Sequence, residues 1–547
     1  RLVSDWSSDV CSSDLVAVFT WAMLSHAQPP LALAWQLPLA ALVVIAFSEL
    51  AVALVNWCAT LLVRPQALPR MDFADGIPVE HRTMVVVPTM LGSVAGVRAL
   101  AEGLEVRYLA NRDPHLHFAL LSDFLDAPAA AMPGDDALVE AAQRQIRQLN
   151  ERYADGGCDR FFLFHRPRLF NAREGAWIGH ERKRGKLGAL NALLRGGDAS
   201  AFSHVVGDTR TLGNVRYVIT LDTDTQLPRD GARELVATLA HPLNRARIDP
   251  ERRIVTSGYG ILQPRVGTSM SGQRRSRYAA LYGSEPGIDP YTRAVSDVYH
   301  DLFGEGSFVG KGIYDIDAFE ATLAGRMPDN RILSHDLLEG CYARAGLVSD
   351  VQLYEDYPAR YLLDVKRRQR WIRGDWQLLP WLLPRVPCHD GGSERNPLSM
   401  LSRGKLLDNL RRSLVPVAMT ALLVIGWLYS PLPLAWTLWL LAIVLMPPLV
   451  ASVMDLFNRP ADLPLPAHLR QAWRATGRNV APVPLTLACL PFEAWISLDA
   501  IGRTLWRSLV SRRHLLQWNP SSEVERTLDG FHRSEEHTSE LQSLTNL

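Results

Sequence analysis

The sequence contains few cysteines, and they follow no pattern. Its 547 residues include six, scattered along the chain without a C-x-x-C pair: Cys11, Cys58, Cys158, Cys341, Cys388 and Cys489. A disulfide framework or a structural zinc site requires clustered, regularly spaced ligands. Cys388 and His389 are adjacent, but two neighbours without further ligands do not make a zinc site. We therefore exclude both kinds of cross-link as organising features and expect a reducing compartment.

The chain also lacks an excess of charge of either sign. It has 58 Lys and Arg residues against 57 Asp and Glu residues, a formal net charge of +1. Proteins that bind nucleic acid through bulk electrostatics are usually strongly basic, so we expect no nucleic-acid partner. A repeat of solenoid period is absent as well, which argues against a repeat architecture.

Long polar stretches are missing from two parts of the chain, which are apolar instead. Between residues 16 and 63 the only formal charge is Glu49, and this length exceeds the roughly 20 residues needed to span a bilayer. Residues 413–455 contain two further apolar stretches separated by Ser430 and Pro431, a pattern typical of a helical hairpin. A third stretch, 480–506, carries three charged residues, so we interpret it as interfacial or weakly spanning.

Basic residues flank these blocks on the side of the intervening region. Arg64 and Arg70 follow the first block, and Arg411 and Arg412 precede the second. The positive-inside rule then places residues 65–412 in the cytoplasm.

The two ends of the chain, residues 1–15 and 533–547, are Ser-rich, aperiodic and similar to translated adapter sequence. We thus expect a non-native leader (1–15), membrane segments (16–63), a cytoplasmic domain (65–412), a membrane hairpin (413–455), an interfacial or spanning region (456–532) and a non-native tail (533–547).

The intervening region alternates short β-branched or aromatic runs with helical patterns, which predicts an α/β fold with a mostly parallel sheet. The candidate strands are 83–88, 117–122, 160–165 and 217–221. In such sheets ligands bind at the carboxyl ends of the strands. The sequence therefore directs attention to the residues that follow each run.

Carboxylates follow two of these strands. Asp123 comes directly after the second, while Asp222 and Asp224 come directly after the fourth. Two aspartates at i and i+2 can hold a hard cation such as Mg²⁺ or Mn²⁺, which neutralises a diphosphate. An isolated D-x-D is also compatible with a solvated turn, so the pattern alone leaves both interpretations open.

Basic residues supply a second clue. The run Lys183-Arg184-Gly185-Lys186 opens a helical pattern at 187–195, where side chains and amides can approach phosphate; an ordinary solvated charge cluster is the alternative. Residues 304–312 superficially suggest an ATPase phosphate loop. Glu305 stands where that loop requires glycine, and Gly312 replaces its Ser or Thr, so we reject the ATPase interpretation.

Two further clusters decide between these alternatives. Asp336 lies in a Ser-His-Asp run, and a carboxylate near an acceptor can take a proton from an attacking hydroxyl. Arg370 and Trp371 can bind a diphosphate and stack on a sugar. Taken alone, the Ser-His-Asp run is no protease triad. The Arg-Trp pair taken alone is also compatible with an amphipathic helix at a membrane surface.

Taken in order, these elements resemble those of processive inverting glycosyltransferases related to cellulose and chitin synthases. The order is Asp123, then Asp222 and Asp224, then Asp336, then Arg370-Trp371. The chain departs from that pattern in having Arg367 where the last motif usually begins with Gln, and Ser-His-Asp in place of Thr-Glu-Asp. The segments 221–232, 260–266, 304–315, 334–340 and 368–382 are similar to the transferase domain of cyclic β-1,2-glucan synthases, over about 65–520.

The resemblance implies a fold, a reaction and a location. The fold is the glycosyltransferase-A type, a Rossmann-like α/β domain, here flanked by transmembrane helices. The reaction is polymerisation of β-1,2-glucan from UDP-glucose, with Mg²⁺ or Mn²⁺ as cofactor and a growing β-glucan chain as acceptor. The location is the lipid bilayer of the bacterial inner membrane. Full members of the family are much longer, so we expect one polymerising module.

The resemblance also implies a role for each site residue. Asp336 is the catalytic base; Asp123, Asp222, Lys186 and Arg370 bind the donor; Trp371, Trp376 and Glu339 bind the acceptor; and Asp222 and Asp224 hold the metal. Three other functions stay open: synthesis of another β-linked polysaccharide, a catalytically silent membrane scaffold that binds glycans, and a membrane-associated hydrolase, since two carboxylates suffice for glycoside cleavage.

Overall fold

The computed structural model describes residues 33–63, 67–154, 158–283, 298–457 and 464–518. The expected leader (1–15) and tail (533–547) lie outside these ranges. So does the first part of the N-terminal apolar block, residues 16–32.

An eight-stranded mixed sheet forms the centre of the domain that follows the first membrane helix. From edge to edge it contains β12 (Ala345–Glu355), β10 (Ile261–Thr268), β11 (Gly312–Asp315), β7 (Tyr217–Thr220), β1 (Thr83–Leu91), β2 (Leu116–Phe124), β3 (Phe161–Arg166) and β6 (His204–Val206). Strands β7, β1, β2 and β3 run parallel, as do β10 and β12, whereas β11 and β6 are antiparallel to their neighbours. The α/β class with a mostly parallel sheet is thereby confirmed.

The central strands are apolar on both faces because helices cover both faces. On β1, Val85 and Val87 join one buried cluster, while Met84 and Val86 join the other. The first cluster lies under α3 (Val94–Ala110), α4 (Asp135–Arg152) and α6 (Gly231–Ala240), and the second under α5 (Arg182–Leu194) and α10 (Ile316–Leu323). All four of these β1 side chains are fully buried, so the alternation along one strand connects the two halves of the core.

Shorter elements surround this core. The two-stranded ribbons are β4 (Leu169–Asn171) with β5 (Ala176–Ile178), β8 (Arg247–Asp249) with β9 (Ile254–Ser257), and β13 (Arg385–Pro387) with β14 (Ser393–Arg395). The remaining helices of this part are α7 (Met270–Gln273), α8 (Arg277–Tyr282), α9 (Val298–Phe303), α11 (Asp336–Ala343) and α12 (Tyr361–Gln377). Of these, α11 and α12 carry the last two sequence clusters.

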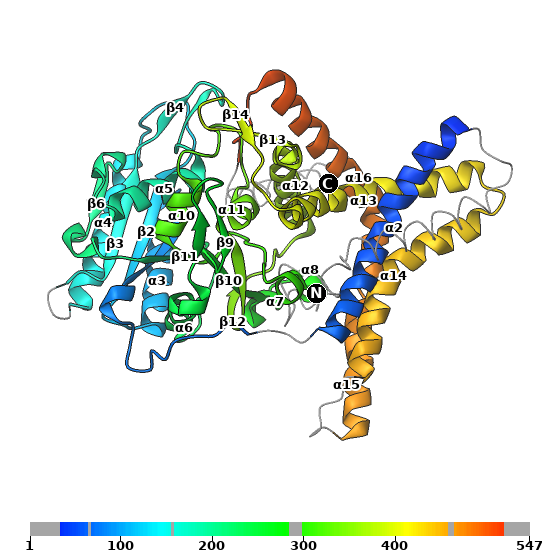
Figure 1. Ribbon diagram of the computed structural model, residues 1–547, viewed down its shortest axis with the longest axis horizontal. Coiled ribbons are helices and arrows are strands. Elements are labelled where there is room, and N and C mark those ends of the chain that lie inside the picture. Colours follow the sequence, from blue (N-terminus) through cyan, green and yellow to red (C-terminus); the bar gives the residue numbers. More distant parts are fainter. Residues whose placement is uncertain (1–32, 64–66, 155–157, 284–297, 458–463, 519–547) are drawn as a thin grey trace, which may run out of the picture.

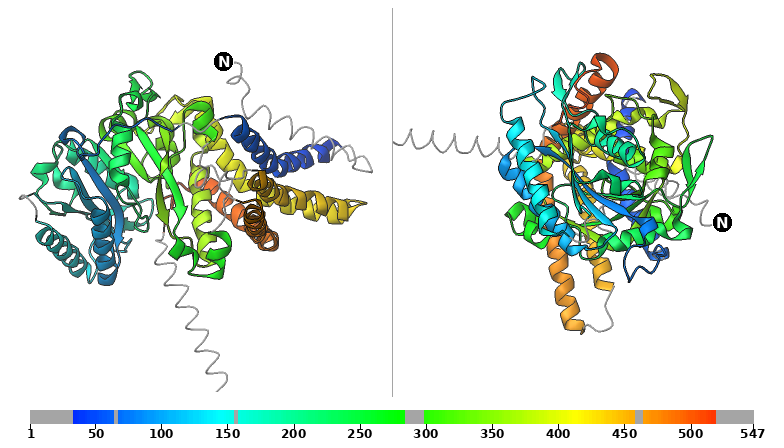
Figure 2. Two further views of the ribbon diagram at one scale, coloured as in Figure 1. Left: turned by 90° about the horizontal axis from the view of Figure 1, so that it is seen from below. Right: turned by 90° about the vertical axis from the view of Figure 1, so that its left-hand side faces the viewer.

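Long apolar helices lie on the side of α12 that faces away from the sheet (Figure 1). They are α2 (Leu33–Leu62), α13 (Met400–Tyr429), α14 (Pro433–Phe457) and α16 (Val483–Trp506), and the shorter helix α15 (Leu465–Val480) between the last two is amphipathic, with three arginines. Within the described part of the chain, four stretches are long and apolar enough to cross a membrane: Gln36–Ala59, Met400–Tyr429, Pro433–Met454 and Leu465–Ser511. Figures 1 and 2 show these helices at one end of the molecule and the sheet at the other.

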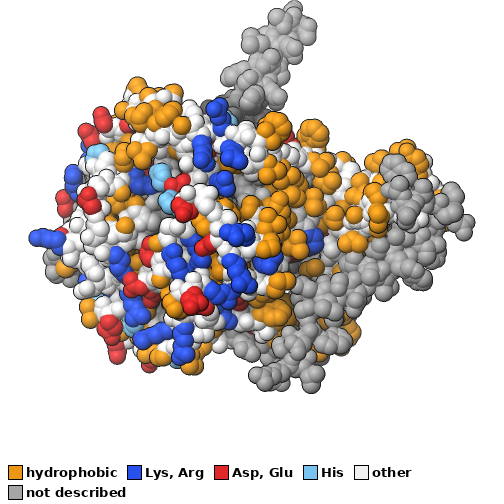
Figure 3. All heavy atoms as spheres, turned by 45° about the horizontal axis from the view of Figure 1, so that its top comes forward, with side chains coloured by type: hydrophobic (Ala, Val, Ile, Leu, Met, Phe, Trp, Pro, Cys, Tyr) orange, Lys and Arg blue, Asp and Glu red, His pale blue; other side chains and the backbone are white. Residues whose placement is uncertain are grey.

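The surface shows the same division. In Figure 3, hydrophobic side chains gather over the helical end, and charged side chains of both signs cover much of the sheet domain. Large apolar side chains such as Leu434, Leu438 and Trp439 on α14 are about half exposed or more. An extended apolar surface of this kind indicates contact with lipid.

Helix α16 joins the two halves through polar contacts with α12. Arg368 donates to Glu493, which also accepts from Tyr361 at 3.0 Å. Gln369 donates to Asp499 at 3.0 Å. Glu493 and Asp499 of the third apolar stretch thus face α12, which stabilises the arrangement because unpaired charges in hydrocarbon are costly.

Candidate functional site

Three carboxylates meet at one edge of the sheet. Asp222 and Asp224 follow β7, and Glu355 is the last residue of β12. One ligand oxygen from each lies within 4.8 Å of the others. The side chain of Thr225 donates to Glu355 at 2.5 Å and so fixes this contact between distant strands. Three carboxylate oxygens at this spacing fit a hard divalent cation, whose oxygen ligands lie about 2.0–2.6 Å from the ion. No motif surrounds Glu355 in the sequence, so its place in the cluster was not predicted.

Two lysines offset part of the negative charge of this cluster. Lys183 Nζ donates to Asp222 Oδ1 at 2.9 Å, and Lys311 Nζ lies 3.4 Å from Asp222 Oδ2 and 2.5 Å from Glu355 Oε1. Burial by itself would raise the pKa of Asp222, but the two ammonium groups lower it well below the ordinary value. Lys311 belongs to the run 304–312, which does not match an ATPase phosphate loop. Its contact with these carboxylates was therefore not predicted either.

Asp224 behaves differently from its neighbour. Its side chain reaches solvent at the rim of the cluster. Partial desolvation, followed by repulsion from Glu355 and Asp222, raises its pKa to about 6. A cation would relieve this repulsion, so the arrangement favours binding of positive charge.

Asp336 is the first residue of α11. The carboxylate is about one quarter exposed and lies against Gly310. His335 Nδ1 lies 2.8 Å from Glu339 Oε1 and 3.7 Å from Asp336 Oδ1. Burial would lower the pKa of His335, but the charges of Glu339 and Asp336 raise it. Glu339 is only 2 % exposed, so it contacts His335 from inside the protein and not from the open side.

Arg370 of α12 faces the same cluster. Its burial lowers the pKa of the guanidinium, while the negative charges of Asp222, Asp336 and Asp224 oppose that change. The guanidinium also lies 5.7 Å from the ring centre of Trp518. Arg370 is therefore the cation of α12 that shares the field of all three aspartates.

The two tryptophans of α12 make their contacts with other groups. Trp371 is 45 % exposed and contacts Arg367, whose guanidinium is 4.9 Å from the ring centre. Trp376 donates from its indole nitrogen to Ser413 of α13 at 2.9 Å. Trp376 thus connects α12 to the first helix of the C-terminal membrane block.

Asp123 and Lys186 form a separate buried group. Asp123 is 2 % exposed, receives two hydrogen bonds of 2.9 Å from Arg166, and lies 3.3 Å from Lys186 Nζ. Burial lowers the pKa of Lys186 to about 8. For Asp123, burial would raise the pKa, but Lys186 and Arg166 lower it. The structure therefore brings this pair together beneath the surface at the end of β2.

Residues 512–518, which we call the C-terminal strap, return from α16 to the sheet domain. Arg182 donates twice to the carbonyl of Leu516, at 3.1 and 3.0 Å, and Gln377 donates to the carbonyl of Leu515 at 2.9 Å. The amide of Leu516 donates to Glu174 at 2.8 Å. Leu515 and Leu516 are buried. The strap connects α5 with α12 and places Trp518 beside Arg370; no local pattern could have revealed these contacts.

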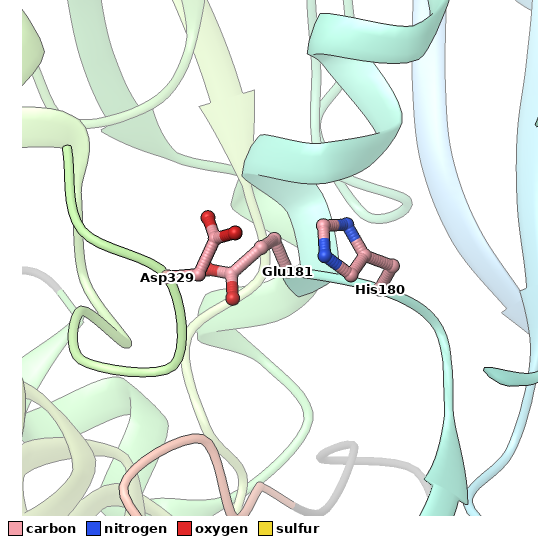
Figure 4. Close-up of side chains that lie close together, drawn as sticks. All are labelled: His180, Glu181 and Asp329. Carbon is pink, nitrogen blue, oxygen red and sulfur yellow. The ribbon is translucent and has the colours of Figure 1, made fainter. Parts of the chain in front are cut away.

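A second carboxylate cluster lies near the start of α5. Figure 4 shows Glu181 between His180 and Asp329, with its carboxylate beside that of Asp329. Glu181 is 5 % exposed and already accepts from Arg184 at 2.5 Å and from the amide of Asn330 at 2.6 Å. Arg184 also approaches Asp329 at 3.4 Å. Arg184 offsets part of the charge of these two carboxylates, and the contacts connect α5 to the loop that precedes α11.

Comparison with known proteins supports this interpretation of the sequence. No family model matches the chain. The chain is 44% identical over 481 residues to the cyclic beta-(1,2)-glucan synthase NdvB of Rhizobium meliloti (strain 1021). The aligned region covers 87% of this chain and 17% of that protein, so the chain spans less than a fifth of the relative's length. This similarity confirms the resemblance indicated by the ordered motifs.

Proposed function

Because the chain is related to the cyclic β-(1,2)-glucan synthases over 87% of its length, we propose that it is a membrane-bound inverting glucosyltransferase. Its donor is UDP-glucose, and its product is β-1,2-glucan. The observation that carries this proposal is the cluster of Asp222, Asp224 and Glu355, which suits a cation-bound diphosphate and shares its electrostatic field with Asp336 and Arg370.

In this proposal Asp336 accepts the proton of the acceptor's 2-hydroxyl. The oxygen forms a bond to the anomeric carbon as the bond to UDP breaks, and inversion gives the β-linkage. UDP leaves with the electron pair of the broken bond. Mg²⁺ or Mn²⁺, held by Asp222 and Asp224 with Glu355, neutralises the diphosphate charge when bound. Arg370 and Lys183 add positive charge on the same side, where preorganised cations contribute most to phosphate departure.

The other predicted residues act around this centre. His335 and Glu339 hold the start of α11 and so orient Asp336, which makes Glu339 a positioning residue next to the acceptor site. Asp123 and Lys186 form the floor of the donor site at the end of β2. Trp371, through its exposed ring, and Trp376, beside its contact with Ser413 of α13, bind the acceptor glucan.

The basic residues that flank the membrane helices support an orientation in the membrane. Arg411 and Arg412 lie on the side of the sheet domain, and Arg411 pairs with Glu49 of α2 at 3.0 Å. Basic flanking residues favour the cytoplasmic face. We place the protein in the bacterial inner membrane, with several spans and the sheet domain in the cytoplasm.

The test is to supply radiolabelled UDP-glucose and Mn²⁺ to the full chain in lipid nanodiscs and to analyse the linkage of the product. We expect a β-1,2-linked polymer, and none from the Asp336→Asn variant. A polymer of another linkage would assign a related transferase. Bound UDP with neither hydrolysis nor polymer would identify a silent scaffold and overturn the proposal. Release of glucose from an added glucan without UDP-glucose would identify a hydrolase.

A further inference from the structure

Lys311 inserts its ammonium group between two of the three carboxylates of the cation site. Its Nζ lies 2.5 Å from Glu355 Oε1 and 3.4 Å from Asp222 Oδ2. The side chain is only 14 % exposed. By contrast, Lys183 approaches Asp222 through the other oxygen, Oδ1, and its second contact is the carbonyl of Gly310. The two lysines therefore occupy different sides of Asp222.

A divalent cation bound by the same carboxylates would need nearly the same position. Metal–oxygen distances are about 2.0–2.6 Å for Mg²⁺ and Ca²⁺, and the ligand oxygens of Asp222, Asp224 and Glu355 lie within 4.8 Å of one another. The space between the Asp222 and Glu355 oxygens already holds Lys311 Nζ. Two positive charges in a poorly solvated site also repel strongly.

We propose that Lys311 is a built-in counter-cation of this site, so that its ammonium group and the divalent cation compete for Glu355 and Asp222. This inference rests on the cation-dependent transfer proposed above. In the cation-free protein, Lys311 holds the two strands together by neutralising their repelling carboxylates. When the divalent cation enters, the ammonium group leaves Glu355 and becomes available to the donor diphosphate.

The backbone that carries Lys311 is closely packed on both sides, so that a movement of its ammonium group is a movement of the side chain. Gly310 and Gly312 flank it with φ values of 85° and 155°, conformations that residues with a side chain rarely adopt. A β-carbon on Gly312 would overlap the carbonyl oxygen of Leu262. The carbonyl of Gly310 accepts from Lys183 at 2.8 Å, and Gly310 lies directly against Asp336. The loop that carries Lys311 is thereby in contact with the proposed base.

The experiment measures Mn²⁺ binding without turnover, by electron paramagnetic resonance of the free ion with the full chain in nanodiscs and no nucleotide. Lys311→Met removes the competing charge, so we expect it to bind Mn²⁺ about tenfold more tightly than the wild type, or better. Lys311→Arg keeps the charge and is expected to show no gain. Lys366→Met removes a lysine charge from the exposed surface of α12 and is the matched control, with unchanged affinity.

The outcomes separate this inference from the proposed function. If wild type and Lys311→Met bind Mn²⁺ equally, or if the Met variant binds it more weakly, the competition is refuted while cation-dependent transfer can still stand. If the wild type binds no Mn²⁺ even with UDP present, the cation-dependent transfer is refuted, and the competition with it. Thermal unfolding of each variant in the same nanodiscs establishes that it is folded, and Lys311→Gln, which keeps a polar side chain, must show the same gain as Met.

Discussion

Gly310 lies directly against Asp336: a β-carbon on Gly310 would come within 2.5 Å of Asp336 Oδ1. Gly310 also has a φ of 85°, where residues with a β-carbon are strained. The loop that carries Lys311 and the residue proposed as base are therefore in contact. A change at Gly310 should reach the chemistry through Asp336 without touching the core of the sheet.

Gly310→Ala should lower the rate of glucosyl transfer at least about tenfold, because the added methyl displaces the Asp336 carboxylate and strains the loop by roughly 1 kcal/mol. The measurement is kcat with UDP-glucose, alongside thermal unfolding. Gly188→Ala is the matched control, since Gly188 lies in α5 with open space around its missing β-carbon. Equal kcat in the two variants would show that the Gly310 contact does not matter.

Asp336→Asn keeps the size of the side chain and removes its ability to accept a proton. We expect transfer to fall by roughly 10²- to 10⁴-fold, the usual contribution of a general base, while UDP affinity stays within about twofold. Isothermal titration with UDP and a radiolabel assay measure the two effects separately. Full turnover by this variant would exclude Asp336 as the base.

Cation binding should depend on pH through Asp224. Its pKa of about 6 exceeds the ordinary value of 3.8, so the folded protein holds this proton more tightly than the unfolded chain does. As the pH rises from about 4 to about 6, the free energy of unfolding therefore decreases, and binding of the cation to the deprotonated carboxylate restores it. Mn²⁺ affinity should be complete above pH 7 and fall about tenfold per pH unit below 6. Asp224→Asn should bind Mn²⁺ more weakly and lose this dependence; an unchanged profile would assign it to another group.

Arg182 should control the C-terminal strap. Its guanidinium holds the carbonyl of Leu516 and pairs with Asp126. Hydrogen bonds from charged groups contribute about 1.5–3 kcal/mol, so Arg182→Ala should raise hydrogen exchange at Leu516 by roughly 10- to 100-fold. Arg210→Ala removes an exposed arginine paired with Asp208 and should leave that exchange unchanged. Slow exchange in both variants would mean that Arg182 is not what holds the strap.

Much of the fold could be predicted from local patterns. The runs at 83–88, 117–122, 160–165 and 217–221 correspond to β1, β2, β3 and β7, because strands buried on both faces must be continuously apolar. The antiparallel β11 was not predicted, since four residues give no periodicity that separates a strand from a loop. Helix α5 begins at Arg182, before the predicted 187–195, because its first turn is basic and not apolar.

The candidate site was only partly predictable. Asp222 and Asp224 could be found because they follow a strand in sequence, and strand ends converge at one edge of a sheet. Glu355 could not: it joins the cluster from β12, with its partner Thr225 lying 130 positions away. Asp123 and Glu339 were identified by type and order, but their burial beside Arg166, Lys186 and His335 depends on packing.

The sequence by itself determined the elements that depend on neighbouring residues: the apolar lengths that can span a bilayer, the strands that are buried on both faces, and the carboxylates at strand ends. Tertiary structure alone decided which charges meet, so that Lys311 lies between Asp222 and Glu355 while Lys186 lies beside Asp123. The physical reason is that hydrophobic periodicity acts over a few residues, whereas ion pairs form between groups that the folded sheet brings within about 4 Å, whatever their separation along the chain.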